Sequence, residues 1–214
     1  MNYISIDTAR KHLEIAGEYQ GQELYFFDES VLQHSVTLMP AIQNLMEGKD
    51  WGLMDYIGVN VGPGSFTGIR IGVTTAKVFS YVKNIKIIPF NSLEMFAYNI
   101  YSACGDTIVS AQASGNSQVY IAVYENQNGK LIELLPPKVF SKPEFERFLG
   151  LIDEPVLVAA DFELPIKKDN FKINYIKDCK TGIKRIMSQT DRISVDGYKL
   201  EPLYIQLPQA QKDL

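Results

Sequence analysis

The sequence contains few cysteines and histidines, the residues that form disulfides and most often bind zinc. Its 214 residues include two cysteines and two histidines. Cys104 and Cys179 lack the close spacing of a metal site, and two isolated cysteines are most simply reduced thiols in an intracellular protein. His12 and His34 lie far apart in the chain, and neither has the partner of a His-x-x-x-His metal clamp. The sequence therefore predicts no metal site.

Long apolar runs and an excess of basic residues are also missing. No run approaches the ~20 apolar residues that span a bilayer, and the first residues lack the basic and apolar regions of a signal peptide. The predicted location is cytoplasmic, without membrane contact. With 21 basic against 25 acidic residues, the formal net charge is -4. This balance disfavours a protein that grips nucleic acid by itself.

The most distinctive segment is a glycine-rich turn, GPGSFTGIRIG, at residues 62–72. It follows a strand-like run, 56–61, and precedes a helical pattern that reaches residue 82. Such a turn lets the backbone approach an anion or another packed element closely. The segment lacks the Lys-Ser/Thr pair of a Walker motif, and its third glycine is displaced from the dinucleotide-binding pattern. Packing or partner contact is therefore preferred over anion binding, which stays open.

Asp7 and Thr8 lie at the turn after the first predicted strand. A carboxylate and a hydroxyl there could hold a magnesium-bound phosphate, although both residues are common in polar turns. The dipeptide alone favours a polar turn, and a vestigial nucleotide-binding site at Asp7 and Thr8 is the alternative that stays open. Ser65 does not belong to a G-x-S-x-G elbow, and neither histidine has a recognisable catalytic partner. The sequence therefore predicts no catalytic residue.

The order of the expected elements indicates an α/β fold. Three strands come first, and helices and strands then alternate, which predicts a mixed sheet with helices on its faces, as in the ribonuclease H-like fold. The second half opens similarly, and a Ser141–Glu144 capping box begins its helix. Two domains are predicted, 1–103 and a shortened copy, 104–214, with a weak pattern between 161 and 190. The other expected elements are strands 3–6, 12–16, 23–27, 56–61, 86–88, 107–113, 118–124, 130–135 and 155–160, and helices 34–46, 65–82, 92–101 and 141–149.

One side of the helix after the glycine turn mixes charged, polar and aromatic residues. Arg70, Thr74, Lys77 and Tyr81 recur there at helical spacing. Such a mixture is typical of a protein interface, and a solvated face is the equally weighted alternative.

Together these segments resemble the TsaB (YeaZ-type) family. Residues 4–8 are similar to its opening strand, His34, Leu38 and Pro40 to its H-x-x-x-L-x-P helix start, and residues 62–72 to its complete glycine signature. The resemblance implies an actin-like (ASKHA) architecture of two ribonuclease H-like lobes with mixed sheets, the second shortened. It also implies a non-catalytic scaffold or activator in the bacterial complex that forms N6-threonylcarbamoyladenosine at position 37 of tRNA.

The catalytic relatives, the TsaD-type subunits, carry a metal-binding N-H-x-E-x-H motif in the helix that corresponds to residues 91–97. Ser92 and Phe96 occupy the two histidine positions here. Phenylalanine cannot bind a metal, and serine rarely does. The second half departs further, because residues 113–120 lack the charged turn of the family. The resemblance thus implies a subunit without metal-assisted chemistry.

The resemblance also implies partners. The helices 34–46 and 65–82 would pack against a TsaD-type catalytic subunit, a TsaE-type ATPase subunit would be a further partner, and tRNA would be reached through the complex. Alone, the same surface could form a homodimer. No cofactor is expected on the isolated chain, and ATP or ADP with magnesium at the complex interface stays open. The expected interface residues are His34, Leu38, Gly62, Pro63, Gly64, Ser65, Arg70, Thr74, Lys77 and Tyr81.

Two other functions remain as alternatives. The first is an ATP-binding or glycoprotease-like enzyme of the actin-like superfamily, for which Asp7 and the glycine turn are the only support. The second is a tRNA-binding module, for which the acidic balance predicts weak binding at physiological salt.

Overall fold

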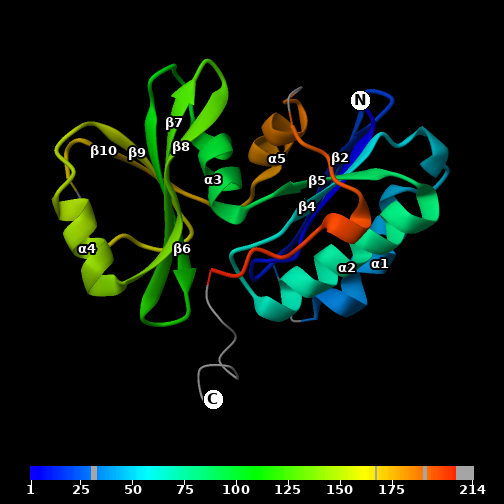
Figure 1. The fold of residues 1–214 in the computed structure, drawn as a ribbon, viewed down its shortest axis with the longest axis horizontal. Helices are drawn as coiled ribbons and strands as arrows, with labels where there is room; N and C mark the ends of the chain where they lie inside the picture. Colours follow the sequence, from blue (N-terminus) through cyan, green and yellow to red (C-terminus); the bar gives the residue numbers. More distant parts are fainter. Residues whose placement is uncertain (30–32, 167, 190–191, 206–214) are drawn as a thin grey trace. The chain divides into compact units, whose positions relative to one another are not determined.

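The computed structural model describes residues 1–29, 33–166, 168–189 and 192–205. The chain forms two compact units (Figure 1). The first comprises Met1–Asn91 and Ile183–Tyr204, and the second comprises Ser92–Gly182 and Ile205. Each unit contains one five-stranded mixed sheet, so the expected α/β class is confirmed. No helix in these described ranges is long and apolar enough to cross a membrane.

The first unit is built on a sheet with the strand order β3-β2-β1-β4-β5. The neighbours β1–β2 and β2–β3 are antiparallel, whereas β4 and β5 continue the sheet in parallel to β1. Its central strand, β1, is buried along its whole length, as expected for a strand covered on both faces. The strands are β1 (Tyr3–Asp7), β2 (Leu13–Tyr19), β3 (Gln22–Asp28), β4 (Tyr56–Asn60) and β5 (Lys86–Phe90).

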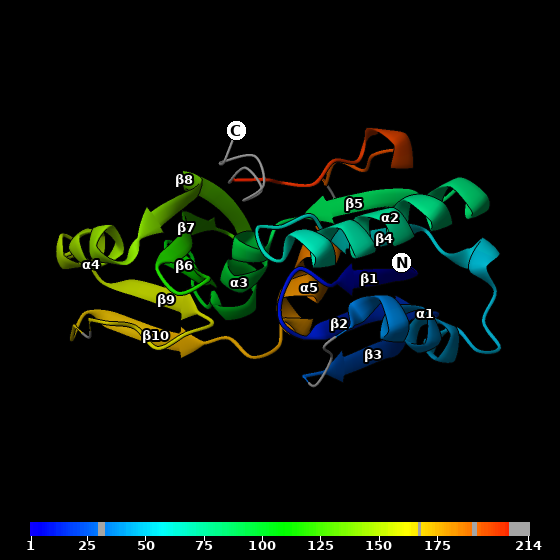
Figure 2. The same cartoon turned by 90° about the horizontal axis from the view of Figure 1, so that it is seen from below.

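Two helices, α1 (His34–Leu45) and α2 (Phe66–Lys83), lie side by side in the first unit (Figures 1 and 2). Their inward side chains, among them Leu38 and Val73, join the strand residues in one apolar core. Apolar spacing of three and four residues predicted both helices, because it places these side chains on one face. Some apolar side chains of both helices remain exposed, among them Val36 of α1 and Val78 of α2. A short 3-10 helix, η1 (Trp51–Leu53), precedes β4.

The second unit repeats the arrangement of the first sheet, with the order β10-β9-β6-β7-β8. The helix α4 (Lys142–Gly150) packs Phe145 and Leu149 into one core of this unit, and α3 (Ser92–Ile100) packs Leu93 and Ala97 into another. No helix joins β9 to β10 in the described part of that connection. The strands are β6 (Thr107–Ser114), β7 (Gln118–Gln127), β8 (Lys130–Ser141), β9 (Val156–Ala160) and β10 (Phe171–Tyr175).

The structure extends the expected elements of the second half. The strand β8 continues to Ser141 through two prolines, which an edge strand tolerates because one of its sides makes no ladder hydrogen bonds. The segment with a weak pattern contains β10 and the helix α5 (Lys180–Met187). Gly182 lowers the helix propensity of α5. Glycine is nevertheless needed at this position, because a Cβ would lie against the backbone oxygen of Met95. The capping box at Ser141 and Glu144 is confirmed.

The observed units divide the chain differently from the expected domains 1–103 and 104–214. The helix α3 belongs to the second unit because it buries Leu93 and Ala97 there. The segment Ile183–Tyr204 returns to the first unit, where Val195 pairs with Ile87 on the edge of β5. A second 3-10 helix in this segment, η2 (Gly197–Lys199), packs on α2.

Candidate functional site

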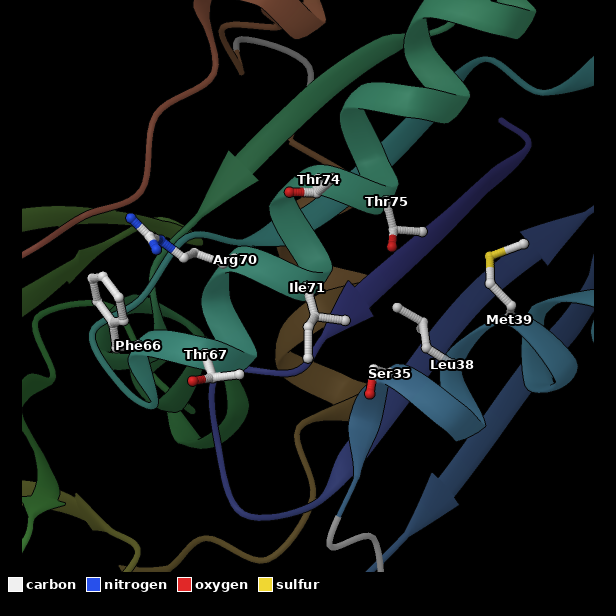
Figure 3. Close-up of a pocket in the computed structure, with 9 residues that line it drawn as sticks. All are labelled: Ser35, Leu38, Met39, Phe66, Thr67, Arg70, Ile71, Thr74 and Thr75. Carbon is white, nitrogen blue, oxygen red and sulfur yellow. The ribbon is translucent and has the colours of Figure 1, made fainter.

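A groove of about 470 Å³ lies between α1 and α2 (Figure 3). Leucine, methionine, phenylalanine and isoleucine side chains give it an apolar lining, and hydroxyl groups add polar positions. Of the lining residues within the described ranges, one arginine is charged. An apolar recess with few polar groups is suited to receive side chains of another molecule. The lining residues are Ser35, Leu38 and Met39 of α1, and Phe66, Thr67, Arg70, Ile71, Thr74 and Thr75 of α2.

Apolar side chains also remain exposed along the outer sides of both helices. Val36 and Met39 are exposed on α1, and Val78, Tyr81 and Val82 on α2. Tyr81 is 90% exposed. Single exposed apolar residues are common, whereas a series at helical spacing on two neighbouring helices marks a candidate contact surface.

Arg70 contacts two neighbouring aromatic residues, Phe66 and Tyr204, at the end of the groove. Its guanidinium carbon is 4.1 Å from the centre of the Phe66 ring, and its Nε donates a hydrogen bond to the Tyr204 hydroxyl at 3.3 Å. The rings of Phe66 and Tyr204 are 5.2 Å apart. Arginine stacks favourably on aromatic faces. This exposed cation is therefore held in place by α2 itself and by the segment that follows η2.

The glycine turn brings the start of α2 against the loop that follows β1. A Cβ at Gly64 would collide with the backbone oxygen of Ala9, and a Cβ at Gly68 with the backbone oxygen of Thr8. The Ser65 backbone N–H donates to the Ala9 oxygen at 2.7 Å, and the Ser65 hydroxyl caps α2 by accepting from the Gly68 N–H. In this structure the glycines therefore permit close packing of one protein backbone on another.

Asp7 and Thr8 use their side chains within the protein. The Asp7 carboxylate accepts hydrogen bonds from the Ala9 backbone N–H at 3.0 Å and from Asn60 Nδ2 at 2.9 Å. The Thr8 hydroxyl donates to the Gly68 carbonyl at 2.7 Å. Both Asp7 and Thr8 are fully buried. Their polar atoms thus stabilise the glycine turn and the loop after β1 by buried hydrogen bonds.

Arg10, which the sequence analysis did not single out, connects two buried carboxylates. Its Nε lies 2.7 Å from Asp7 Oδ2, and its Nη2 lies 2.5 Å from Glu14 Oε2. All three side chains are almost completely buried. Buried charges require such partners because removal from water is costly. The spacings of three and four residues between these charges were the available signal, but spacing alone does not reveal burial.

The two histidines lie near this ion network. His12 packs on Phe27 with 4.7 Å between ring centres, and burial, together with the nearby Arg10 charge, lowers the pKa of His12 to about 4. One nitrogen of His34 lies 3.0 Å from the Arg10 backbone oxygen. A group of three or more metal-ligating side chains does not occur within the ranges that the structure describes.

The structure brings some of the expected interface residues together. Arg70 and Thr74 line the groove, and Leu38 forms its buried floor. Tyr81 lies farther along α2, and the Lys77 backbone oxygen is close to Gly197. The other expected residues do not line the groove. His34 contacts the Arg10 backbone, Gly62 and Pro63 are buried, and Gly64 and Ser65 pack on Ala9.

The sequence analysis missed the row of α2 that faces α1. Thr67, Ile71 and Thr75 recur there at spacings of four residues and line the groove. This periodicity was the signal that could have identified them, because it places residues along one side of a helix. Tyr204 lies in a segment, 202–205, that resembles the P-x-Y-x-R end of the family, but this pattern does not reveal its contact with Arg70.

Comparisons with known proteins find similar sequences whose names refer to threonylcarbamoyl groups and tRNA. The family described as "TsaD: tRNA N6-adenosine threonylcarbamoyltransferase" matches residues 29–178. The chain is 36% identical over 161 residues to the "tRNA threonylcarbamoyladenosine biosynthesis protein TsaB" of Bacillus subtilis, which covers 73% of this chain and 69% of that protein. It is 26% identical over 168 residues to the protein of the same name from Escherichia coli, with coverage of 76% and 73%.

A solved structure from Pseudomonas aeruginosa has a similar fold. It is described as an uncharacterized protein with similarity to peptidase YEAZ, and the superposition has a TM-score of 0.79. The match covers 96% of this chain and 99% of the other, at 18% sequence identity.

Proposed function

The chain belongs to the TsaB (YeaZ-type) family, and on this premise we propose that it is a non-catalytic scaffold or activator subunit that dimerises with a TsaD-type threonylcarbamoyltransferase. The complex would form N6-threonylcarbamoyladenosine at position 37 of tRNA. The observation that carries the docking proposal is the groove between α1 and α2, with exposed apolar residues along both helices. A helix of the partner can bury such a surface by packing its own side chains into the groove.

The proposed non-catalytic role is supported by the hydrogen bonds of the buried carboxylate Asp7 in the first unit. The Asp7 carboxylate already accepts from the Ala9 and Asn60 groups and is paired with Arg10. Because these interactions satisfy its oxygens internally, Asp7 supports the fold of the loop rather than an open catalytic centre. The partner would supply the metal-assisted chemistry.

Other partners follow from the same proposal. A TsaE-type ATPase would join the complex, and tRNA would be held through the TsaD-type subunit. Without its partner, the chain would cover the exposed side chains Val78 and Val82 by forming a homodimer through the same helices. A nucleotide with magnesium at the subunit interface is compatible with this arrangement.

Binding of the TsaD-type subunit tests the docking surface directly. Arg70→Glu reverses the charge in the groove, and Thr74→Trp fills its outer part (Figure 3). We expect each variant to weaken the complex at least about tenfold in calorimetry, in the range of a binding hot spot. Lys138→Glu makes the same charge change at an exposed position of β8 and should bind as the unchanged protein does.

Two results would contradict the proposal. If both variants bound the TsaD-type subunit as tightly as the unchanged protein, the α1–α2 surface would not be the interface. If the isolated chain bound ATP with micromolar affinity and lost it on Asp7→Ala, the ATP-binding enzyme would become the better interpretation.

A further inference from the structure

In the Phe66–Arg70–Tyr204 cluster, the two terminal nitrogens of the Arg70 guanidinium can still bind another molecule. Nε of Arg70 donates to the Tyr204 hydroxyl, and the Phe66 ring covers a face of the guanidinium. Within the described ranges, the Nη1 and Nη2 groups make no hydrogen bond or ion pair with the protein. Arg70 is exposed at the end of the groove. These two nitrogens therefore form a fork directed by the cluster and open to another molecule.

We infer that Tyr204 is a positioning residue that holds Arg70 ready to bind a side-chain carboxylate of the TsaD-type subunit. This inference rests on the function proposed above and specifies its chemistry. A partner helix would place an apolar side chain in the groove and an aspartate or glutamate against the arginine fork. The two Nη groups match the two oxygens of one carboxylate.

The charges around the groove favour a single carboxylate as the occupant. Among the described residues that line it, Arg70 alone is charged, and the others supply hydroxyl or apolar groups. The cation is therefore not neutralised by the groove itself. One carboxylate would balance it and leave no further charge unpaired when the surface is buried, which is the condition for a favourable buried ion pair.

The position of Tyr204 gives it a distinct role. An exposed arginine samples many rotamers, and binding must fix one of them at a cost in conformational entropy. The tyrosine hydroxyl and ring restrict Arg70 before the partner arrives. Tyr204 lies on a segment that Val195 and Leu203 attach to β5 and to the end of β4 by backbone hydrogen bonds. The restraint is thus anchored to the sheet.

A double-mutant cycle separates positioning from simple packing. We expect Arg70→Met to weaken binding of the TsaD-type subunit about 10- to 100-fold, because hydrogen bonds to charged groups are lost. Tyr204→Leu should weaken it about fivefold in the unchanged protein and should have no effect when Arg70 is already methionine. Tyr198→Leu is the matched control, since Tyr198 is an exposed tyrosine of the same segment, and it should bind normally.

Salt dependence provides a second readout. Raising the ionic strength should weaken binding of the unchanged protein more than binding of Arg70→Met, because the pair involves two charges. Arg70→Lys should recover the salt dependence but only part of the affinity, because lysine lacks the fork. Thermal unfolding of each variant shows whether a loss of binding follows from a loss of folding.

Several outcomes would overturn the inference. If the TsaD-type subunit binds the unchanged protein and Arg70→Met equally, the carboxylate contact is wrong while the proposed function stands. If Tyr204→Leu weakens binding equally in both backgrounds, Tyr204 acts by packing and does not position Arg70. If Arg70 matters only when ADP and magnesium are added, the fork takes a phosphate. If the unchanged protein does not bind the subunit, the proposed function and this inference both fail.

Discussion

The Arg10 guanidinium lies 2.7 Å from the Asp7 carboxylate, and both side chains are almost completely buried. On its other side the same guanidinium meets Glu14. One buried cation thus compensates the charges of two buried carboxylates near the end of the central strand β1. Removing it leaves negative charges without their compensating partner in a medium that solvates them poorly.

Arg10→Met is therefore expected to destabilise the protein strongly. Loss of one partner from a buried ion network costs about 3–5 kcal/mol of unfolding free energy, and urea unfolding at neutral pH measures it. Lys11→Met removes the same charge from the neighbouring exposed residue and should change stability little. Equal stability of the two variants would contradict a structural role for the network.

Gly68→Ala should disturb the contact between α2 and the loop after β1. The added methyl group meets the Thr8 backbone oxygen, which cannot move away as a flexible side chain could. Overpacking of this kind costs about 1–3 kcal/mol or more, observable as a lower midpoint in thermal unfolding. Gly150→Ala is a matched control because nothing lies within 4 Å of its added carbon. An unchanged melting temperature for Gly68→Ala would mean that α2 can move away from Thr8 without loss of stability.

Stability should fall as the pH is lowered through the range in which His12 titrates. Burial holds the pKa of His12 at about 4 in the folded protein, whereas an unfolded histidine titrates near 6.5. Between these values the unfolded chain binds more protons, so acid favours unfolding. His12→Phe removes the titrating group and keeps a ring against Phe27.

The His12 measurement compares urea unfolding of both proteins from pH 7 to about 4. The unchanged protein should lose more unfolding free energy on acidification than His12→Phe, because the carboxylates titrate in both. Parallel pH curves would show that the folded protein does not depress the pKa of His12.

The exposed apolar residues near the end of α2 should promote self-association. Val78 and Val82 lie one turn apart and are largely exposed. Replacing both with serine should weaken any homodimer in sedimentation experiments while leaving thermal stability nearly unchanged, because little buried surface is lost. Ile193→Ser changes a similarly exposed apolar residue and serves as the control. An equal effect of the control would assign self-association to general surface hydrophobicity.

Local sequence patterns correctly predicted most helices and strands of the first unit. The spacing of Leu38 and Ile42 predicted α1, and the glycine turn correctly separated β4 from α2. The end of β8 and all of α5 were missed because prolines and Gly182 oppose regular structure locally. Their tertiary neighbours compensate for these unfavourable residues.

The candidate site was less predictable than the fold. Arg70 and Thr74 were identified from helical spacing, and they do line the groove. The contact of Arg70 with Tyr204 joins positions 134 residues apart, a relationship that no local pattern contains. The burial of Arg10 likewise depends on the packing around the loop, because the sequence alone shows only three charges in a polar turn.

The return of Ile183–Tyr204 to the first unit has a consequence for the protein's synthesis on the ribosome. Val195 and Leu200 complete the edge and the core of this unit, yet they are translated after the whole second sheet. During synthesis, part of the apolar surface of the first sheet therefore stays uncovered until the second sheet has been translated. Domain-by-domain folding from the N-terminus cannot complete the first unit until Val195 and Leu200 have been translated.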